Sequence, residues 1–477
     1  MLFNSFDFFL FFPIVVIIYF ILPYKYRWLL LLSASCLFYM AFIPYYILIL
    51  GGTIVIDYFA GILIEGAKNA KQRRNFLFLS LVANIGVLAV FKYYNFFIQN
   101  VDALTHFFGF SPHIPYLSII LPIGLSFHTF QAMSYTIEVY RGNFKAERHF
   151  GIYALYVMFF PQLVAGPIER PQNILPQLRK KNDVDYQRIV SGLKMMLWGF
   201  FKKIVIADRL AVIVNYAYNS PGTYDGFSLL IATYFFSFQI YCDFSGYSDI
   251  AVGAAKVMGY DLMENFRIPY ISKSIKEFWE RWHISLSSWF RDYLYIPLGG
   301  NRVKKWKWYY NLFIVFIISG FWHGANWTFI VWGALHGSYL IISMFLSTIL
   351  KKYFQMKSMV KNSFQVILTF HLAAFAWIFF RAKNMHEAKI IIYKITHINT
   401  YAFKNIHLLD NVKIYTLLIT TGLLFVFVLL DSSMDSFIKN RTYISNKFFR
   451  LVIFATILAV MIIFGYFGRT DFIYFQF

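Results

Sequence analysis

Residues 6–22 read FDFFLFFPIVVIIYFIL and contain a single charged side chain, Asp7. A helix needs about 20 apolar residues to cross the hydrocarbon core of a bilayer, with a range of roughly 17 to 25. This stretch is therefore long enough for nearly a full crossing. It lacks the basic start and the small-residue cleavage site of a secretory signal peptide, so we expect a retained first membrane helix.

Similar apolar runs recur along the whole chain, and the length rule predicts roughly ten to twelve hydrophobic helices. The candidate crossings lie near residues 6–22, 28–42, 45–65, 75–95, 116–140, 190–208, 228–258, 309–322, 326–350, 363–380, 412–430 and 451–467. Residues 150–168 and 270–298 are interrupted by Pro and Gly, so we expect partial insertion or helices in the membrane interface. We predict an all-α polytopic membrane protein with one domain over residues 1–477.

Composition supports this class. Hydrophobic residues make up 59% of the 477 residues and charged residues 14%, whereas a soluble domain carries about 25% charged residues. An aromatic content of 22% excludes intrinsic disorder. The two cysteines lie inside apolar runs and are expected to be core thiols.

The net charge of +21 has its source in short basic loops, not in a nucleic-acid-binding domain. Such loops face the cytoplasm under the positive-inside rule. The clusters occupy residues 68–74, 141–148, 179–181, 302–307, 351–352 and 439–450. One apolar run follows the last cluster, so the tail at residues 468–477 is expected outside the cytoplasm, and so is the N-terminus.

Residues 277–301, EFWERWHISLSSWFRDYLYIPLGGN, place charged side chains between tryptophans. On one helix Trp279, Trp282 and Leu286 would share a face, which is typical of an amphipathic segment anchored at the interface. His283 is the unusual member, because it lies among tryptophans close to the point where the chain enters the bilayer again.

Residues 318–337, ISGFWHGANWTFIVWGALHG, place His323 at a glycine-flanked break between two apolar runs. A lone buried histidine is usually a hydrogen-bonded core residue. Ionisable groups at membrane depth are nevertheless rare and often functional, and a neutral imidazole suits proton abstraction near pH 7. Asn326 offers an amide that could position a substrate. Because no two histidines have the spacing of a helical zinc site, we expect no metal.

Residues 243–249, DFSGYSD, place two carboxylates inside an apolar segment. They fit either a cation relay in a transporter or a polar joint at a helix break near Gly246, and we favour the joint.

Several stretches together resemble the membrane-bound O-acyltransferases, and in particular the bacterial branch that acts on alginate, peptidoglycan and teichoic acid. The resemblance runs nearly end to end. The specific motifs are KEFWERWHISLSSWFRDYLYIPLGGN at residues 276–301 and SGFWHGANWTFIVWG at residues 319–333; PIGLSFHTFQ at residues 122–131 is weaker.

This resemblance implies a ring of tilted helices around a thin centre, with His323 and His283 as the catalytic pair. Trp322, Trp282 and Asn326 are candidates for positioning substrate. The implied donor is an acyl thioester, acetyl-CoA or an acyl carrier protein, without a tightly bound cofactor. The implied setting is the bacterial inner membrane, with membrane lipids, a cell-envelope polysaccharide and an extracytoplasmic SGNH-type transferase as partners.

The chain ends FIYFQF, residues 472–477, with Tyr474 at the centre. This tail resembles a terminal aromatic motif of the D-alanylation system in which a tyrosine is proposed to receive the acyl group. An aromatic anchor at the interface is an equal alternative. For the whole chain, the rival functions are a transporter or flippase and a lipid or protein acyltransferase of the same family.

Overall fold

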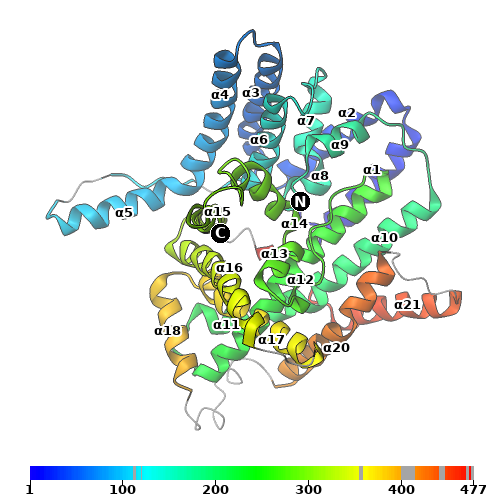
Figure 1. The fold of residues 1–477 in the computed structure, drawn as a ribbon. Coiled ribbons are helices and arrows are strands. Elements are labelled where there is room, and N and C mark those ends of the chain that lie inside the picture. Colours follow the sequence, from blue (N-terminus) through cyan, green and yellow to red (C-terminus); the bar gives the residue numbers. More distant parts are fainter. Residues whose placement is uncertain are drawn as a thin grey trace. The chain divides into compact units, whose positions relative to one another are not determined.

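Most of the described residues lie in helices, which confirms the all-α fold class predicted from the sequence. The computed structural model describes residues 1–110, 114–119, 121–353, 358–398, 414–439, 446–468 and 472–473, and these contain no strand (Figure 1). The chain forms two compact units. The first comprises residues 1–196 and 250–263, and the second comprises residues 197–249 and 264–477.

The helices differ widely in length. Those that begin in the first unit are α1 (Phe6–Ile21), α2 (Tyr24–Met40), α3 (Tyr46–Gly66), α4 (Ala70–Leu88), η1 (Ala89–Tyr93), α5 (Tyr94–Phe107), α6 (Leu125–Arg141), α7 (Phe150–Met158), α8 (Phe160–Leu163), α9 (Pro171–Leu178) and α10 (Tyr186–Phe200). Those that begin in the second unit are η2 (Phe201–Ala207), α11 (Asp208–Asn219), α12 (Gly226–Met258), η3 (Pro269–Ile271), α13 (Ile275–Arg281), α14 (Ile284–Phe290), η4 (Arg291–Tyr295), α15 (Lys305–His323), α16 (Trp327–Tyr353), α17 (Ser358–Arg381), α18 (Met385–Thr396), α20 (Ile414–Ile438) and α21 (Lys447–Phe464).

Within the described residues, seven helices are long and apolar enough to cross a membrane, so the chain is a multi-pass membrane protein. The predicted number of ten to twelve was too high, although every predicted segment is helical over most of its length. The difference has a physical cause. The helices α1, α2 and α6 contain only 16, 17 and 17 residues, and the run at 190–208 changes from α-helix to π-helix at Phe201. Helices of 16 or 17 residues lie at the lower limit of the length that a full crossing needs, and a π-helical turn interrupts the regular α-helix of the run at 190–208.

In the first unit, α3, α4 and α6 pack around a buried carboxyl group. Asp57 on α3 accepts hydrogen bonds from Ser80 Oγ at 2.6 Å and from Asn84 Nδ2 at 2.9 Å, both on α4. A buried polar group of this kind is tolerated because its partners are in place. Asp57 is therefore a structural residue whose hydrogen bonds hold α3 against α4.

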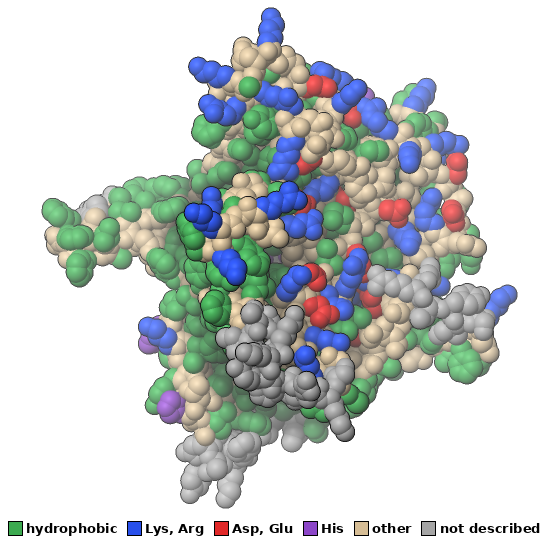
Figure 2. Space-filling model, viewed as in Figure 1, with side chains coloured by type: hydrophobic (Ala, Val, Ile, Leu, Met, Phe, Trp, Pro, Cys, Tyr) green, Lys and Arg blue, Asp and Glu red, His purple; other side chains and the backbone are tan. Residues whose placement is uncertain are grey.

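The helices α4, η1 and α5 follow one another without a break, and the two ends of this run differ in charge. Basic residues cluster where α3 turns into α4, whereas the arm formed by α5 carries hydrophobic side chains and no Lys or Arg (Figures 1 and 2). The helices α4, η1 and α5 together extend over residues 70–107. The orientation of these two ends across a membrane stays a prediction of the positive-inside rule.

Residues 150–168 form α7, α8 and a turn, and all of them except Phe150 are buried inside the first unit. The expectation of partial insertion or of helices in the membrane interface stays a prediction. Glu169 follows directly, accepts hydrogen bonds from Asn173 Nδ2 at 2.7 Å and Met263 N at 2.5 Å, and is fully buried. Burial raises the pKa of this carboxyl group to about 7. These bonds support a structural role for Glu169 at the end of the loop.

In the second unit, α15 and α16 form a hairpin, and α17 packs against α16. The two helices of the hairpin pack closely because Gly320 on α15 faces Gly333 on α16. A Cβ atom on Gly320 would come within 2.2 Å of the Phe329 carbonyl oxygen, and one on Gly333 within 2.3 Å of the Phe316 carbonyl oxygen. Glycine at these two positions therefore permits the close approach of the two backbones.

Candidate active site

His323 is the last residue of α15, at the tight connection to α16. Its side chain is only 4% exposed. The centres of the Trp322, Trp332 and Phe380 rings lie 4.9, 5.0 and 5.3 Å from the centre of the imidazole, each in an edge-to-face arrangement. The C-terminus of a helix carries a partial negative charge that favours the protonated form of a histidine there. The imidazole of His323 thus lies at a helix C-terminus inside an apolar enclosure, and its role as a base stays a prediction.

His283 occupies a sharp break in the chain. Its backbone lies in the left-handed region at φ +45°, between α13 and α14, and its side chain is fully buried. Residues other than glycine adopt this conformation only where their surroundings compensate its cost. Asn265 provides the compensation, because its carbonyl oxygen accepts from Ile284 N at 2.9 Å and its Oδ1 from Ser285 N at 3.3 Å.

The same Asn265 assigns the tautomer of His283. Its Oδ1 lies 3.0 Å from His283 Nδ1 and 3.0 Å from Ser285 Oγ. Because an amide oxygen can only accept, we place the proton on Nδ1, which leaves the lone pair on Nε2. Burial lowers the pKa of this imidazole to about 3, so it is neutral at pH 7. A neutral ring with this tautomer presents an acceptor at Nε2, and the catalytic role expected of His283 stays a prediction.

The break also corrects the prediction of one amphipathic interfacial helix over residues 277–301. The segment forms two short helices and the π-helical turn η4. Trp282, Leu286 and Trp289 are buried in the second unit, which shows that they are core residues. The sequence pattern was compatible with either placement because a tryptophan-rich face packs equally well against protein.

Tryptophan rings connect the surroundings of the two predicted catalytic histidines. The Trp282 ring, next to His283 in the chain, lies 5.0 Å from the Trp377 ring. Trp377 stacks on Trp332 at 5.9 Å, and Trp332 in turn contacts His323. The structure thus brings both histidines and the predicted Trp322 and Trp282 into one aromatic core.

His336 is a third histidine of this core, and sequence reasoning did not select it for function. It is fully buried on α16, and its ring centre lies 5.0 Å from Trp332. Trp279 Nε1 donates to His336 Nδ1 at 3.3 Å. Trp332 and His336 are four positions apart, which is about one helix turn, so they lie on the same face of α16. This spacing is the feature of the sequence that could have pointed to His336.

Asn326 has backbone partners. Its Nδ2 donates to the Lys383 carbonyl oxygen at 2.8 Å, and its Oδ1 accepts from Thr328 N at 3.1 Å. The amide therefore ties the start of α16 to the residues that follow α17. Its role in positioning a substrate stays a prediction.

The carboxylates of residues 243–249 form ion pairs. Lys203 Nζ lies 2.6 Å from Asp243 and 2.8 Å from Asp208, and Lys202 Nζ lies 2.5 Å from Asp249. The interpretation as a joint at a helix break was wrong, because α12 continues without interruption through Gly246. A buried charge is tolerated when it is paired, and the lysines come from a segment that sequence reasoning had treated only as a membrane helix.

The last described residues of the chain are buried in the second unit. Ile473 N donates to Asp243 Oδ2 at 2.7 Å, and the Phe472 ring lies 4.7 Å from Tyr247 and 5.6 Å from Phe244. The Phe244 ring lies 4.6 Å from the His283 ring. Residues 472–473 are therefore anchored one aromatic ring away from His283. Tyr474 lies outside the described residues.

Comparison with known proteins supplies the family. The model of the MBOAT, membrane-bound O-acyltransferase family, matches residues 146–382, which include both predicted catalytic histidines. The chain is 40% identical over 393 residues to a probable alginate O-acetylase of Pseudomonas aeruginosa, covering 81% of this chain and 73% of that protein. It is 37% identical over 434 residues to a peptidoglycan O-acetyltransferase of Helicobacter pylori, covering 84% and 80%.

A more distant relative is a teichoic acid D-alanyltransferase of Bacillus subtilis, which is 31% identical over 345 residues, covering 68% of this chain and 83% of that protein. The resemblance found in the sequence motifs is thereby confirmed. The chain belongs to the membrane-bound O-acyltransferase family and is an O-acyltransferase.

Proposed function

We propose that this enzyme moves an acetyl group from a cytoplasmic thioester across the membrane for O-acetylation of an extracytoplasmic polysaccharide. The relatives named for alginate, peptidoglycan and teichoic acid support a polymer outside the cytoplasm as the final acceptor. The observation that carries the proposal is the placement of His323 at the C-terminal end of α15, inside an aromatic enclosure.

His323 acts as the general base. Its imidazole takes the proton of an acceptor hydroxyl while the oxygen attacks the carbonyl carbon of the thioester. The tetrahedral intermediate then collapses, the carbon–sulfur bond breaks, and the thiolate leaves with the proton that His323 returns. The products are an ester and a free thiol. The rings of Trp322, Trp332 and Phe380 exclude water, which would otherwise compete as the acceptor.

His283 orients the acceptor. Its Nε2 lone pair can accept a hydrogen bond from a hydroxyl group, because the proton of the ring is engaged with Asn265. This role differs from oxyanion stabilisation, which would require a donor at the same atom.

Tyr474 is the proposed first acceptor. The preceding residue, Ile473, is held by Asp243, and consecutive Cα atoms are about 3.8 Å apart. Residues 472–473, directly before Tyr474, are anchored one aromatic ring away from His283. A phenolic ester formed there would pass to a separate SGNH-type transferase, which places the acetyl group on the polysaccharide. Because a phenolate is a good leaving group, such an ester is suited to onward transfer.

The donor side is proposed to face the cytoplasm of a bacterial inner membrane, and both termini to lie on the other side. The basic loops would attract the phosphates of acetyl-CoA or an acidic acyl carrier protein. A transporter is not favoured, because the two carboxylates that a relay would need are paired with Lys202 and Lys203. A lipid or protein acceptor would involve the same chemistry and differs only in what receives the acetyl group.

The test is the acetyl-ester content of the cell envelope in a strain that lacks this protein. We expect one polymer to lose its O-acetyl groups, and the wild-type protein to restore them. Tyr474→Phe keeps the ring and removes the hydroxyl, so it should fail to restore them at normal protein level. Restoration by Tyr474→Phe would show that the tail is only an anchor, and unchanged esters in the deletion strain would contradict the proposed function.

A further inference from the structure

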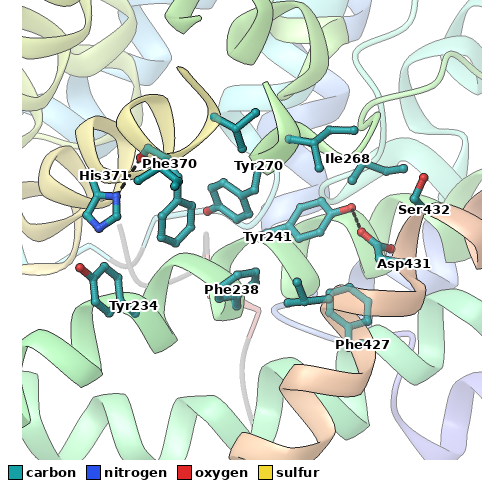
Figure 3. A pocket seen from close by; sticks show the side chains of 14 residues that line it. Tyr234, Phe238, Tyr241, Ile268, Tyr270, Phe370, His371, Phe427, Asp431 and Ser432 are labelled. Carbon is teal, nitrogen blue, oxygen red and sulfur yellow. Dashed lines mark hydrogen bonds between the residues drawn. The ribbon is translucent and has the colours of Figure 1, made fainter. Parts of the chain in front are cut away.

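The second unit contains an open, aromatic groove whose lining includes neither His283 nor His323. Its volume is about 610 Å³, which falls within the range of ligand sites. The groove lies along α12 between α17 and α20, with the segment around η3 completing its wall (Figure 3). Tyr234, Phe238 and Tyr241 on α12 follow one another at helical spacing, so they form a continuous strip about 10 Å long.

The open side of the groove faces hydrocarbon. All three helices, α12, α17 and α20, are among those long and apolar enough to cross the membrane. Ile367 on α17 and Val428 on α20 line the groove and are 57% and 49% exposed. Exposed aliphatic side chains on membrane-crossing helices contact lipid chains, so the ligands available to this groove come from the bilayer.

One end of the groove is polar. Tyr241 Oη donates to Asp431 Oδ2 at 2.9 Å, and Figure 3 shows this pair and Ser432 at the end opposite Tyr234 and His371. Asp431 is 4% exposed, and its Oδ1 has no hydrogen-bond partner among the described residues. This atom is a buried acceptor on the lining of a groove, and it requires a donor.

The charges around Asp431 select the kind of donor. Four carboxyl groups, two lysines and one arginine gather there in the described part of the chain, which leaves a formal excess of one negative charge. Lys202 pairs with Asp249, Lys439 pairs with Asp435 and Glu264, and Arg267 also pairs with Glu264. An anionic head group would be repelled by this end of the groove, whereas an ammonium group would be attracted.

We propose that the groove binds one acyl chain of an ethanolamine phospholipid, whose ammonium group donates to Asp431. An ammonium has three donors, and a carboxylate oxygen is its strongest partner. Asp431 lies seven residues before the end of α20, or about 10 Å along the helix. The basic cluster after α20 places that end at the cytoplasmic face, so the lipid comes from the inner leaflet.

The bound lipid would support the catalytic core. Tyr270 and Tyr241 line the groove, and the Trp282 ring lies 6.1 and 6.3 Å from them. Trp377 Nε1 also donates to Tyr270 Oη at 3.2 Å. The ligand thus packs against the outer side of the rings that connect His283 with His323.

The first test is native mass spectrometry of the full chain, released from detergent after incubation with phosphatidylethanolamine. Ile367→Trp places a large ring in the groove and should reduce the fraction of lipid-bound protein by roughly tenfold, since several methylene groups lose their burial. The matched control is Leu368→Trp, a neighbouring exposed position that does not line the groove. An equal effect of both substitutions, or of neither, would overturn the proposed site.

The second test uses equal amounts of phosphatidylethanolamine and phosphatidylglycerol. The wild-type chain should retain the ethanolamine lipid about fivefold more than the glycerol lipid, and Asp431→Asn should abolish the preference while keeping the shape of the side chain. Equal retention of the two lipids by the wild-type chain, or a preference that survives Asp431→Asn, would contradict the assignment of the head group. Because neither test measures acetyl transfer, a failure here is distinguishable from a failure of the proposed function.

Discussion

His283 Nδ1 and Asn265 Oδ1 lie 3.0 Å apart, and this contact fixes which nitrogen of the imidazole carries the proton. The same asparagine holds the left-handed turn that points the ring into the aromatic core. One residue, through its backbone carbonyl and its side chain, therefore sets both the position and the tautomer of His283. The turn between α13 and α14 therefore holds Nε2 of His283, a hydrogen-bond acceptor, in a buried site.

Substitutions of His283 should distinguish this acceptor role from that of a base. Gln at this position can present its Oε1 near the place of Nε2, so His283→Gln is expected to retain about a tenth of wild-type kcat. His283→Ala should lose about 100-fold, with a smaller change in KM. Kinetics of acetyl transfer by the purified protein measure both values. Equal losses for the two variants, at equal folded yield, would exclude the acceptor role.

Acid should destabilise the protein through the same histidine. Because burial lowers the pKa of His283 to about 3, the folded state binds fewer protons than the unfolded state between about pH 6.5 and pH 3. Above about pH 6.5 the ring is neutral in both states, and His283 does not reduce the free energy of unfolding. As the pH drops through this window, the free energy of unfolding falls by roughly 1.4 kcal/mol per pH unit. Thermal unfolding of the wild type and of His283→Gln at pH 7.5, 6 and 5 tests this. The wild type should lose more stability than the variant, and parallel curves would contradict the assignment.

Lys203 and its two buried partners, Asp208 and Asp243, are expected to stabilise the fold. Lys203→Met leaves two carboxylates without their cation, which should lower the free energy of unfolding by about 3–5 kcal/mol. Lys276→Met removes an exposed lysine whose ion pair with Glu280 is 3.6 Å long, and it should cost less than about 1 kcal/mol. Unfolding monitored in detergent compares the two. A Lys203→Met protein of wild-type stability would reopen the relay interpretation of these carboxylates.

The close approach of α15 and α16 gives a further expectation. Gly320→Ala should destabilise the hairpin by about 1–3 kcal/mol, because its Cβ atom would overlap the Phe329 carbonyl oxygen. Gly422→Ala lies on α20, where nothing is within 4 Å of the new atom, and it should be neutral or slightly stabilising. The comparison uses the midpoint of thermal unfolding. The account of the hairpin fails if Gly320→Ala is as stable as Gly422→Ala.

The sequence predicted most of the local structure, because apolar run length and glycine position determine where membrane helices form and how closely they pack. It also placed His323 and His283 in one chemical site through family motifs. It could not reveal the break at His283, since a histidine with positive φ has no sequence signature and depends on Asn265, 18 residues earlier. The Lys203–Asp243 pair was missed for a related reason, because 40 residues separate the partners and only the folded chain brings them together.

The groove beside Tyr241 was also beyond sequence reasoning. It is formed by α12, α17 and α20, which lie far apart in the chain. Each helix alone reads as an ordinary apolar segment. Only their packing leaves Asp431 on the lining of an open space, so its carboxyl group could not be distinguished from a satisfied core residue.

The central claim concerns His323, and it is tested most directly by the rate of acetyl transfer from acetyl-CoA to an acceptor hydroxyl by the purified protein in proteoliposomes. Removal of the general base with His323→Ala should reduce this rate by about 10²–10⁴-fold while the unfolding temperature changes little. The same substitution should leave the binding of the thioester nearly unchanged. Transfer by His323→Ala at the wild-type rate, with the protein folded and present in equal amount, would contradict the account.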